Sequence, residues 1–355
     1  MGIRGLSGPD ESTVAGAPGL RDTRGRGLRD LRISVTDRCN FRCPYCMPAE
    51  VFGEGYRFLP RKDILRLEEI LRIARLVARA GATKMRITGG EPLARANLAA
   101  LIEGLAATPG VTDLALTTNA VLLPAHAPRL AEAGLQRVTT SLDSLRPEVF
   151  ARMSGGRGTV DQVLAGIAAA QAAGLTPLKV NCVVQRGVND DGVLELARHF
   201  RGTGHILRFI EFMDVGTMNR WDHSQVVPAR ELLDRIDAEL PLEPTEPNYH
   251  GEVARRYRYR DGAGEIGMIA SVSQPFCGDC SRARLSAEGE LVTCLFAKEG
   301  RDLKTPMREG ASDDTLYQMI TGSWQERTDR YSEERSAGAG PQKAGDRIEM
   351  YKIGG

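Results

Sequence analysis

The chain contains the stretch Cys39-Asn40-Phe41-Arg42-Cys43-Pro44-Tyr45-Cys46, in which three thiols are spaced C-x3-C-x2-C. It follows an apolar run, residues 31–35, that is typical of a β-strand. Thiolates are soft ligands that suit iron–sulfur clusters or zinc, and a closed structural zinc site takes four protein ligands. Three thiols therefore indicate a [4Fe–4S] cluster with one iron free for another ligand. A zinc site completed by a remote residue is the alternative.

The bulk composition limits the classes of function. The chain has 355 residues, 42% hydrophobic and 26% charged, with a formal net charge of +1. This is typical of a soluble globular protein and predicts no general attraction to nucleic acid or membrane. No apolar run reaches the roughly 18 residues of a membrane span, and no signal peptide is evident, so we expect a cytoplasmic protein. Six of the seven cysteines fall in two short groups, which in a reducing compartment indicates metal binding rather than disulfides.

The chain divides into three regions. Residues 1–27 are rich in Gly and Arg, lack apolar periodicity and are predicted to be a disordered lead. Strand and helix patterns alternate within residues 28–245, which we interpret as one domain. Residues 246–355 contain β-like pieces and the second cysteine group, and within them the polar residues 330–347 are expected to be mobile.

Six strand-like runs alternate with helical patterns that repeat every 3.6 residues, several of them ending at Gly. Six βα units favour parallel strands covered by helices and are too few for a closed eight-stranded barrel. The predicted fold class is therefore α/β, an incomplete (βα)6 barrel with its chemistry at the C-terminal ends of the strands. The predicted strands are residues 31–36, 84–88, 113–117, 137–142, 178–184 and 205–211.

Small and polar residues stand at several predicted strand ends. Gly89 and Gly90 would let the backbone approach a ligand, although a simple Gly-rich turn has the same composition. Residues 117–119 and 141–143 offer hydroxyl, amide and carboxylate groups that suit a ribose, a carboxylate or a phosphate. The same groups also serve as ordinary caps and turns, so both readings stay open.

Basic side chains lie on strands that should be apolar. Strands inside a parallel barrel are normally apolar, so a cation there needs an anionic partner or exposure. A highly charged anion such as a triphosphate would satisfy several cations at once, and pairing with acids at the rim is the alternative. The residues concerned are Arg32, Lys84, Arg86, Lys179 and Arg208.

A second group of three thiols consists of Cys277, Cys280 and Cys294, spaced C-x2-C-x13-C. Arg282 and Arg284 follow it two residues apart in a strand-like run, so both point the same way. A second three-thiolate cluster beside two arginines fits this pattern, with a zinc ribbon lacking its fourth ligand as the alternative. The seventh thiol, Cys182, lies in an apolar run and is interpreted as a core residue.

Together these motifs resemble the radical S-adenosylmethionine (SAM) superfamily and, within it, the GTP 3′,8-cyclase family, also called molybdenum cofactor biosynthesis protein A (MoaA). The resemblance covers about residues 28–355 and departs from the family at Ala120, where Gly is usual. It implies a radical-SAM barrel with a C-terminal iron–sulfur extension. The stretches that carry it are residues 35–43, Met85-Arg86-Ile87-Thr88-Gly89-Gly90-Glu91-Pro92-Leu93, Phe212-Met213-Asp214, residues 277–285 and Gly354-Gly355.

The resemblance implies a role for each matching residue. Cys39, Cys43 and Cys46 would hold the [4Fe–4S] cluster that binds SAM, and Cys277, Cys280 and Cys294 a second [4Fe–4S] cluster beside the guanine. The implied SAM contacts are Tyr45, Gly90, Ser141 and Met213. The implied GTP contacts are Arg32, Lys84, Arg86, Thr117, Lys179, Arg208, Arg282 and Arg284. The implied catalytic set is Arg282, Arg284, Gly354 and Gly355, the last two in a tail that reaches into the active site.

The implied reaction converts GTP into 3′,8-cyclo-7,8-dihydro-GTP, the first step of molybdopterin biosynthesis. A 5′-deoxyadenosyl radical takes the C3′ hydrogen, and the C3′ radical attacks guanine C8. Implied partners are an external electron donor and, as product acceptor, cyclic pyranopterin monophosphate synthase; the oligomeric state, a homodimer included, stays open. The alternatives are another radical SAM enzyme with an auxiliary cluster, for example a peptide-modifying one, and a non-catalytic metal-binding redox sensor.

Overall fold

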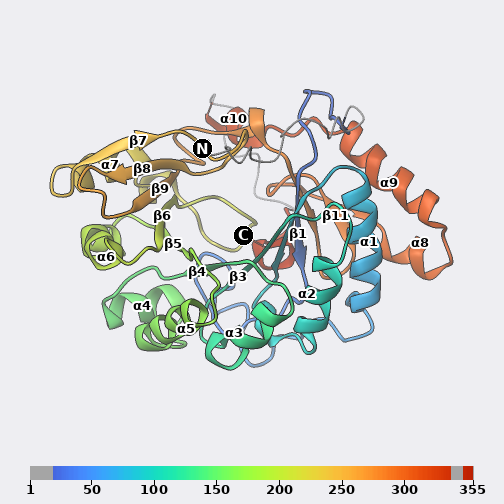
Figure 1. Cartoon of the computed structure of the whole chain (residues 1–355), viewed down its shortest axis with the longest axis horizontal. Coiled ribbons are helices and arrows are strands. Elements are labelled where there is room, and N and C mark those ends of the chain that lie inside the picture. The colour runs from blue at the N-terminus through green and yellow to red at the C-terminus, as the bar shows by residue number, and fades with distance from the viewer. Residues whose placement is uncertain (1–18, 337–346, 355) are drawn as a thin grey trace, which may run out of the picture.

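The computed structural model of the chain describes residues 19–336 and 347–354, which build one continuous twelve-stranded sheet (Figure 1). Its strands are β1 (Asp30–Ser34), β2 (Lys84–Thr88), β3 (Asp113–Thr118), β4 (Arg137–Ser141), β5 (Lys179–Val184), β6 (Ile206–Glu211), β7 (Leu242–Thr245), β8 (Arg255–Tyr259), β9 (Glu265–Ile269), β10 (Arg282–Leu285), β11 (Glu290–Val292) and β12 (Arg301–Asp302). Their order is β12-β11-β10-β1-β2-β3-β4-β5-β6-β9-β8-β7.

The sheet is parallel from β10 through β1 to β6 and on to β9, and antiparallel at both ends. Its two end strands do not pair with each other, so the prediction of an incomplete barrel is confirmed. The C-terminal strands continue the barrel sheet, because β9 pairs with β6 and β10 with β1. One sheet therefore runs across the expected domain boundary at residue 245.

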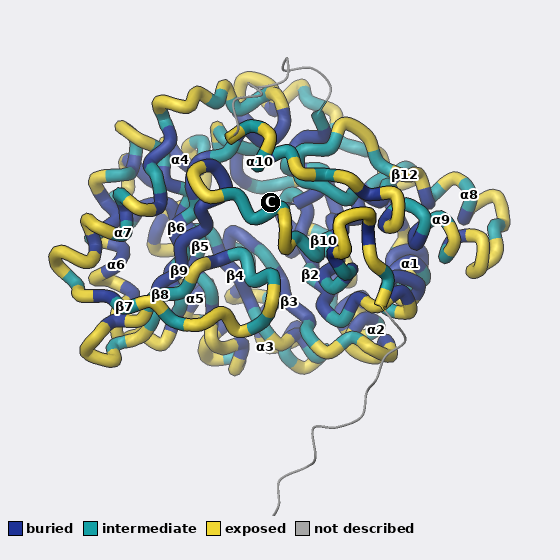
Figure 2. The backbone as a smooth tube through the Cα atoms, turned by 90° about the horizontal axis from the view of Figure 1, so that it is seen from above, coloured by how far each residue is buried: buried dark blue, intermediate teal, exposed yellow. Residues whose placement is uncertain are grey.

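Helices cover the outer face of the curved sheet (Figure 1). In Figure 2 the strands are mostly buried and the outer helix faces are exposed. The six predicted barrel strands are present with ends that differ from the predicted ones by at most two residues, whereas α4 was not predicted. The described helices are α1 (Leu67–Arg79), α2 (Leu98–Ala106), α3 (Leu123–Glu132), α4 (Pro147–Ser154), α5 (Val160–Ala172), α6 (Val193–Phe200), α7 (Ala229–Asp237), α8 (Lys304–Arg308), α9 (Asp313–Gln325), α10 (Tyr331–Ser336) and α11 (Met350–Ile353).

Helix α5 illustrates how the sequence specifies these units. Its N-cap, Thr159, accepts a hydrogen bond from the Gln162 backbone, and the Gln162 side chain accepts one from the Thr159 backbone. The helix buries Val163 and Ile167 against the sheet, on the face given by the 3.6-residue period. The chain leaves the helix at Gly174, whose φ of 78° is easily adopted only by glycine.

None of the described helices is both long and apolar enough to cross a membrane.

Candidate active site

The first cysteine group lies in the loop after β1, at the C-terminal end of the strand. All three thiols are free and partly buried. Cys39 Sγ accepts hydrogen bonds from the Phe41 backbone N–H (3.4 Å) and from Asn119 Nδ2 (3.9 Å). Burial, reinforced by the nearby Glu91 carboxylate, raises the pKa of Cys39 to about 11. A thiolate at this position therefore needs a compensating cation, which the iron of a cluster supplies.

Gly89 and Gly90 pack directly on this loop. Gly90 N–H donates to the Thr36 carbonyl at 2.8 Å, and Glu91 N–H donates to the Arg38 carbonyl at 2.7 Å. A Cβ on Gly90 would overlap the Arg38 carbonyl, so the protein's own backbone already requires glycine at position 90. The paired glycines thus serve to join β2 to the cysteine loop, a role that the sequence interpretation did not include.

The Glu91 carboxylate is buried and ties β2 to the end of β3. It accepts hydrogen bonds from Thr118 Oγ1 (2.7 Å) and from the backbone N–H groups of Asn119 (2.8 Å) and Leu93 (3.0 Å). Ala120, which follows Asn119, has a φ of 70°. This left-handed conformation explains why the family usually has glycine there. Alanine in this conformation costs roughly 1 kcal/mol.

Asp143 positions Tyr45 within the cysteine loop. The Tyr45 hydroxyl donates to Asp143 Oδ2 at 2.8 Å, and the other carboxylate oxygen accepts from the Val183 backbone N–H at 2.8 Å. Burial raises the pKa of Asp143 to about 6. The ends of β4 and β5 therefore fix the aromatic ring between the second and third thiols.

Three arginines form a row across neighbouring strands. In the register of the sheet, Arg32 on β1 lies beside Arg284 on β10 and beside Arg86 on β2. Burial, followed by repulsion from Arg284 and Arg86, lowers the pKa of Arg32 well below its usual value. Arg86 also donates to the hydroxyls of Thr117 and Thr139, both at 3.3 Å. Such a row of like charges is stabilised by an anion that bridges them.

Further cations extend this surface. Lys84 lies 3.3 Å from Asp30 and donates to the Tyr249 hydroxyl at 2.9 Å. Burial and then repulsion from Arg208 lower the pKa of Lys179 to about 7, and burial and then Arg86 lower that of Arg208 to about 9. Burial is the larger cause of both shifts, and the repulsion shows that Lys179, Arg208 and Arg86 lie close enough to act on one anion.

The second cysteine group faces the same cavity as these cations. Arg282 Nη2 donates to Cys280 Sγ at 3.3 Å. Although burial acts in the opposite direction, Arg282 and Arg327 lower the pKa of the Cys280 thiol to about 6. The described residues contain no three ligand side chains close enough to hold a single metal ion, and a four-iron cluster spreads its thiolates more widely than one ion does. Three free thiols beside two arginines fit such a cluster.

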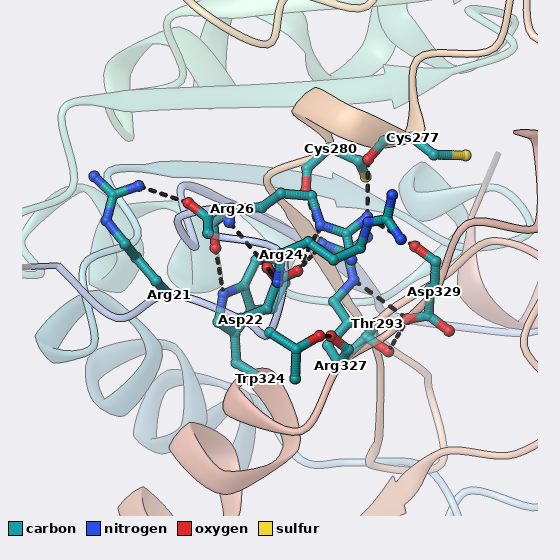
Figure 3. Close-up of polar contacts among 12 residues, drawn as sticks. Arg21, Asp22, Arg24, Arg26, Cys277, Cys280, Thr293, Trp324, Arg327 and Asp329 are labelled. Atoms are coloured by element: carbon teal, nitrogen blue, oxygen red, sulfur yellow. Dashed lines mark hydrogen bonds and ion pairs between the residues drawn. The ribbon is translucent and has the colours of Figure 1, made fainter.

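An N-terminal segment supports the second group from behind (Figure 3). Arg26 donates to the carbonyls of Cys277 (2.8 Å) and Asp329 (2.7 Å), and Arg327 donates to the carbonyl of Cys280 (2.7 Å). Asp22 is buried between the two arginines, 2.6 Å from Arg26 and 3.6 Å from Arg327. The prediction of a disordered lead is therefore wrong for residues 19–27, and residues 1–18 lie outside the described residues. Local composition hid these contacts because their partners are remote in sequence.

Replacing Asp22 with alanine is expected to destabilise the protein by about 3 to 5 kcal/mol, because two buried guanidinium groups lose their shared carboxylate. The iron content of the second cysteine group should fall with it. Chemical denaturation and iron analysis after reconstitution measure both effects. The matched control is Asp314→Ala, whose exposed carboxylate lies 3.4 Å from Arg79 and should matter by less than about 0.5 kcal/mol. Equal effects of the two substitutions would contradict this role for Asp22.

The C-terminal tail is held by Arg284 on β10. Arg284 donates to the carbonyls of Ile353 (3.2 Å) and Gly354. Gly354 has a φ of 68° and packs on Thr88, where a Cβ would overlap the threonine side chain. Gly355 lies outside the described residues. The expectation of a mobile segment at 330–347 is wrong for α10 and for Arg347, both of which contact Asp214.

Some of the site residues predicted from the sequence line the cavity together. Those residues are Arg32, Lys84, Arg86, Lys179, Arg208, Met213, Cys277, Cys280, Arg282, Arg284 and Cys294. Thr117 reaches it through Arg86. The others lie outside its lining: Cys39, Cys43, Cys46, Tyr45, Gly90, Ser141 and Gly354. The sequence interpretation missed the lining residues Asn181, Tyr249 and Glu252, which belong to no motif.

Two family models match consecutive parts of the chain. Residues 33–200 match the family described as the Radical SAM superfamily, and residues 205–333 match Molybdenum Cofactor Synthesis C. Among solved structures, "Native anSMEcpe with bound AdoMet and Cp18Cys peptide" is similar with a TM-score of 0.51 at 15% sequence identity, over 85% of this chain and 84% of that one. At this identity the similarity supports the fold alone.

Curated relatives are much closer in sequence. A GTP 3′,8-cyclase of Acidothermus cellulolyticus (strain ATCC 43068 / DSM 8971 / 11B) is 56% identical over 321 residues, 89% of each chain. One of Xanthomonas campestris pv. campestris (strain B100) is 53% identical over 96% of this chain and 99% of its own, and one of Staphylococcus aureus (strain Newman) is 45% identical over 95% and 99%. This chain belongs to the GTP 3′,8-cyclase family of the radical SAM superfamily.

Proposed function

We propose that this chain converts GTP into 3′,8-cyclo-7,8-dihydro-GTP, the first step of molybdenum cofactor biosynthesis. One observation carries the proposal beyond family membership: a single cavity contains both the cationic strands and the second group of three thiols. A triphosphate and a base need different partners, and the cavity offers both. Neither a peptide-modifying enzyme nor a redox sensor requires a row of arginines next to a cysteine group.

At the first cysteine group, Cys39, Cys43 and Cys46 would hold a [4Fe–4S] cluster with SAM on its free iron. When bound, this pair supplies the one-electron chemistry that yields a 5′-deoxyadenosyl radical, which takes the C3′ hydrogen of GTP. Within the protein, Asp143 orients Tyr45 and the paired glycines hold the cysteine loop on β2. We assign SAM contacts to Tyr45, Gly90, Ser141 and Met213.

At the cationic surface, we assign the triphosphate to the row Arg284, Arg32 and Arg86. Its planar guanidinium groups can each make two hydrogen bonds to phosphate oxygens. Lys179 and Arg208 add charge from β5 and β6. The cations fix the nucleotide so that the ribose and the base keep one orientation during the reaction. Holding the reacting atoms in place lowers the activation barrier.

For the base, we assign a second [4Fe–4S] cluster on Cys277, Cys280 and Cys294. Arg282 and Arg327 support it, since both interact with Cys280 and favour its thiolate form. An external one-electron donor and an enzyme that consumes the cyclised nucleotide complete the proposed partners.

Binding of GTP is expected to take up about half a proton at pH 7 and nearly one at pH 8, because the triphosphate raises the pKa of Lys179 from about 7. The contribution of Lys179 to affinity should be nearly constant below about pH 6, where Lys179 is already charged, and should fall as the pH rises through 7. Isothermal titration calorimetry in buffers of different ionisation enthalpy measures the uptake. If the proton uptake persists unchanged in Lys179→Met, Lys179 is not the group that takes up the proton.

Iron analysis and nucleotide binding test the assignment without turnover. The reconstituted chain should hold about eight irons, and Cys280→Ala about four. GTP should bind the chain more tightly than ATP, and the preference should shrink in Cys280→Ala if the second group meets the base. About four irons in the parent chain, or equal affinity for both nucleotides, would exclude the proposed base site.

A further inference from the structure

Residues 347–353, here called the strap, contact the first cysteine group, the residues that flank Cys294 and the loop after β6. In Figure 1 the C-terminal segment lies within the curve of the sheet. Within the tail, the resemblance to the cyclase family assigns a role only to the final Gly-Gly. The strap precedes it, and its contacts show how the tail is held.

The first anchor is a buried carboxylate. Glu349 Oε1 accepts hydrogen bonds from the backbone N–H (2.8 Å) and the hydroxyl (2.7 Å) of Thr217. Its other oxygen packs on Gly216, where a Cβ would overlap the carboxylate. Gly216 also has a φ of 71°, so the loop is shaped around Glu349 in two ways. A buried carboxylate with matched donors is not what a frayed chain end provides.

The second anchor is a cation held by the same loop. Arg347 donates to the backbone carbonyl (2.9 Å) and the carboxylate (3.2 Å) of Asp214, and to the Tyr331 hydroxyl (2.7 Å). Its guanidinium also stacks 4.4 Å from the centre of the Tyr331 ring. Asp214 follows Met213, which we assigned to the SAM site, so this loop joins the strap to that site.

Two apolar contacts link the strap to the first cysteine group and to the residues that flank Cys294. Tyr351 packs in a cluster with Met47 and Phe52 that also touches Cys39 and Cys46, and its hydroxyl is 3.0 Å from that of Tyr56. On the other side, Ile348 and Ile353 pack on Val292, with Leu295 and Ala297 beside them. These last three residues flank Cys294 in sequence. The strap therefore spans from one cysteine group to the other.

We propose that the strap is a positioning element that fixes the two cysteine groups relative to each other and keeps SAM cleavage coupled to GTP conversion. This inference rests on the proposed function. A reactive radical survives only in a cavity closed to water and other hydrogen donors. The strap packs on the loop of the first cysteine group on one side and on Val292, next to the second group, on the other. When the strap is displaced, SAM is still cleaved, but fewer cleavage events end in cyclised nucleotide.

The substitution Gly216→Ala tests the proposal, because the added methyl group meets the Glu349 carboxylate. Gly187→Ala is the matched control: Gly187 has almost the same φ, 72°, and open space where the methyl group would lie. Both variants carry the same backbone strain, about 1 kcal/mol. Only the first displaces the strap.

For Gly216→Ala we expect the ratio of 5′-deoxyadenosine to cyclised GTP to rise about tenfold, with iron content unchanged. Hydrogen exchange of the full reconstituted chain should become faster in residues 347–353 and 47–58. Gly187→Ala should match the parent chain in both. A proportional fall of both products would overturn the proposal, because a general loss of stability predicts it. Unchanged hydrogen exchange would also overturn it, because it would mean that the strap is not displaced.

A milder variant guards against misfolding. Tyr351→Phe removes only the hydrogen bond to Tyr56, and we expect the same changes at about a third of the size. If Gly216→Ala does not fold, this variant decides the proposal by the same two measurements. If the parent chain forms no cyclised GTP, the proposed function has failed, and hydrogen exchange alone decides whether the strap joins the two groups.

Discussion

Replacing Cys43 with alanine is expected to abolish formation of 5′-deoxyadenosine, a fall of at least about 10³-fold, because SAM cleavage needs a complete cluster on three thiolates. Cys43 is the middle thiol of its loop, and its backbone carbonyl accepts hydrogen bonds from the N–H groups of Cys46 and Met47. The loop backbone should survive the substitution, while the cluster should not. Iron content should fall from about eight to about four per chain.

Cys182 provides the control for this substitution. It lies fully buried in β5, where its sulfur accepts a weak hydrogen bond from Asn189 Nδ2 (3.8 Å) and donates one to the Asp143 carbonyl (3.6 Å). Cys182→Ala should cost about 1 kcal/mol of stability and leave iron content and turnover unchanged. SAM cleavage by Cys43→Ala, or loss of a cluster in Cys182→Ala, would contradict the assignment of ligands.

Replacing Arg284 with alanine is expected to lower conversion of GTP by about 10² to 10³-fold while SAM cleavage persists. Arg284 is buried at one end of the row that it forms with Arg32 and Arg86, and it donates to two carbonyls of the tail. Burial, followed by repulsion from Arg282, lowers its pKa to about 9, so the side chain is still charged at neutral pH. Its removal would leave both the phosphate site and the tail without their shared cation.

The measurement is product formation per SAM cleaved, with iron content as the check on folding. Arg186→Ala is the control, since Arg186 is exposed and pairs with Glu231 at 2.7 Å, and it should behave as the parent chain does. Arg284→Lys should recover part of the activity, because an ammonium restores the charge but not the paired hydrogen bonds. Full activity in Arg284→Ala would exclude a role for this row in binding the nucleotide.

The parts of the fold that the sequence predicts well are those with a strong local period. β2 has the predicted bounds, residues 84–88, and α5 ends within one residue of its predicted end because cap, apolar stripe and terminal glycine all agree. Helix α4 was missed since residues 147–154 are too few to show a clear period. The short C-terminal helix α11 was missed for the same reason.

The candidate site was predictable where chemistry is unusual in sequence. Grouped thiols and cations on parallel strands are rare, so the sequence alone singles them out. The supporting residues were not predictable. Asp22 and Arg26 lie in a segment whose composition is typical of disorder, yet Arg26 contacts Cys277 and Asp329, which are 251 and 303 residues away. Glu349 likewise needs Thr217, 132 residues distant. No local pattern encodes such contacts.

The most direct test of the proposed reaction is anaerobic turnover of the reconstituted chain with SAM, a strong reductant and GTP that carries deuterium at C3′. Mass spectrometry would follow both products. The expected result is 5′-deoxyadenosine containing one deuterium, formed together with an equal amount of a cyclised GTP isomer. The contradicting result is 5′-deoxyadenosine without deuterium and unchanged GTP, from protein that holds both clusters.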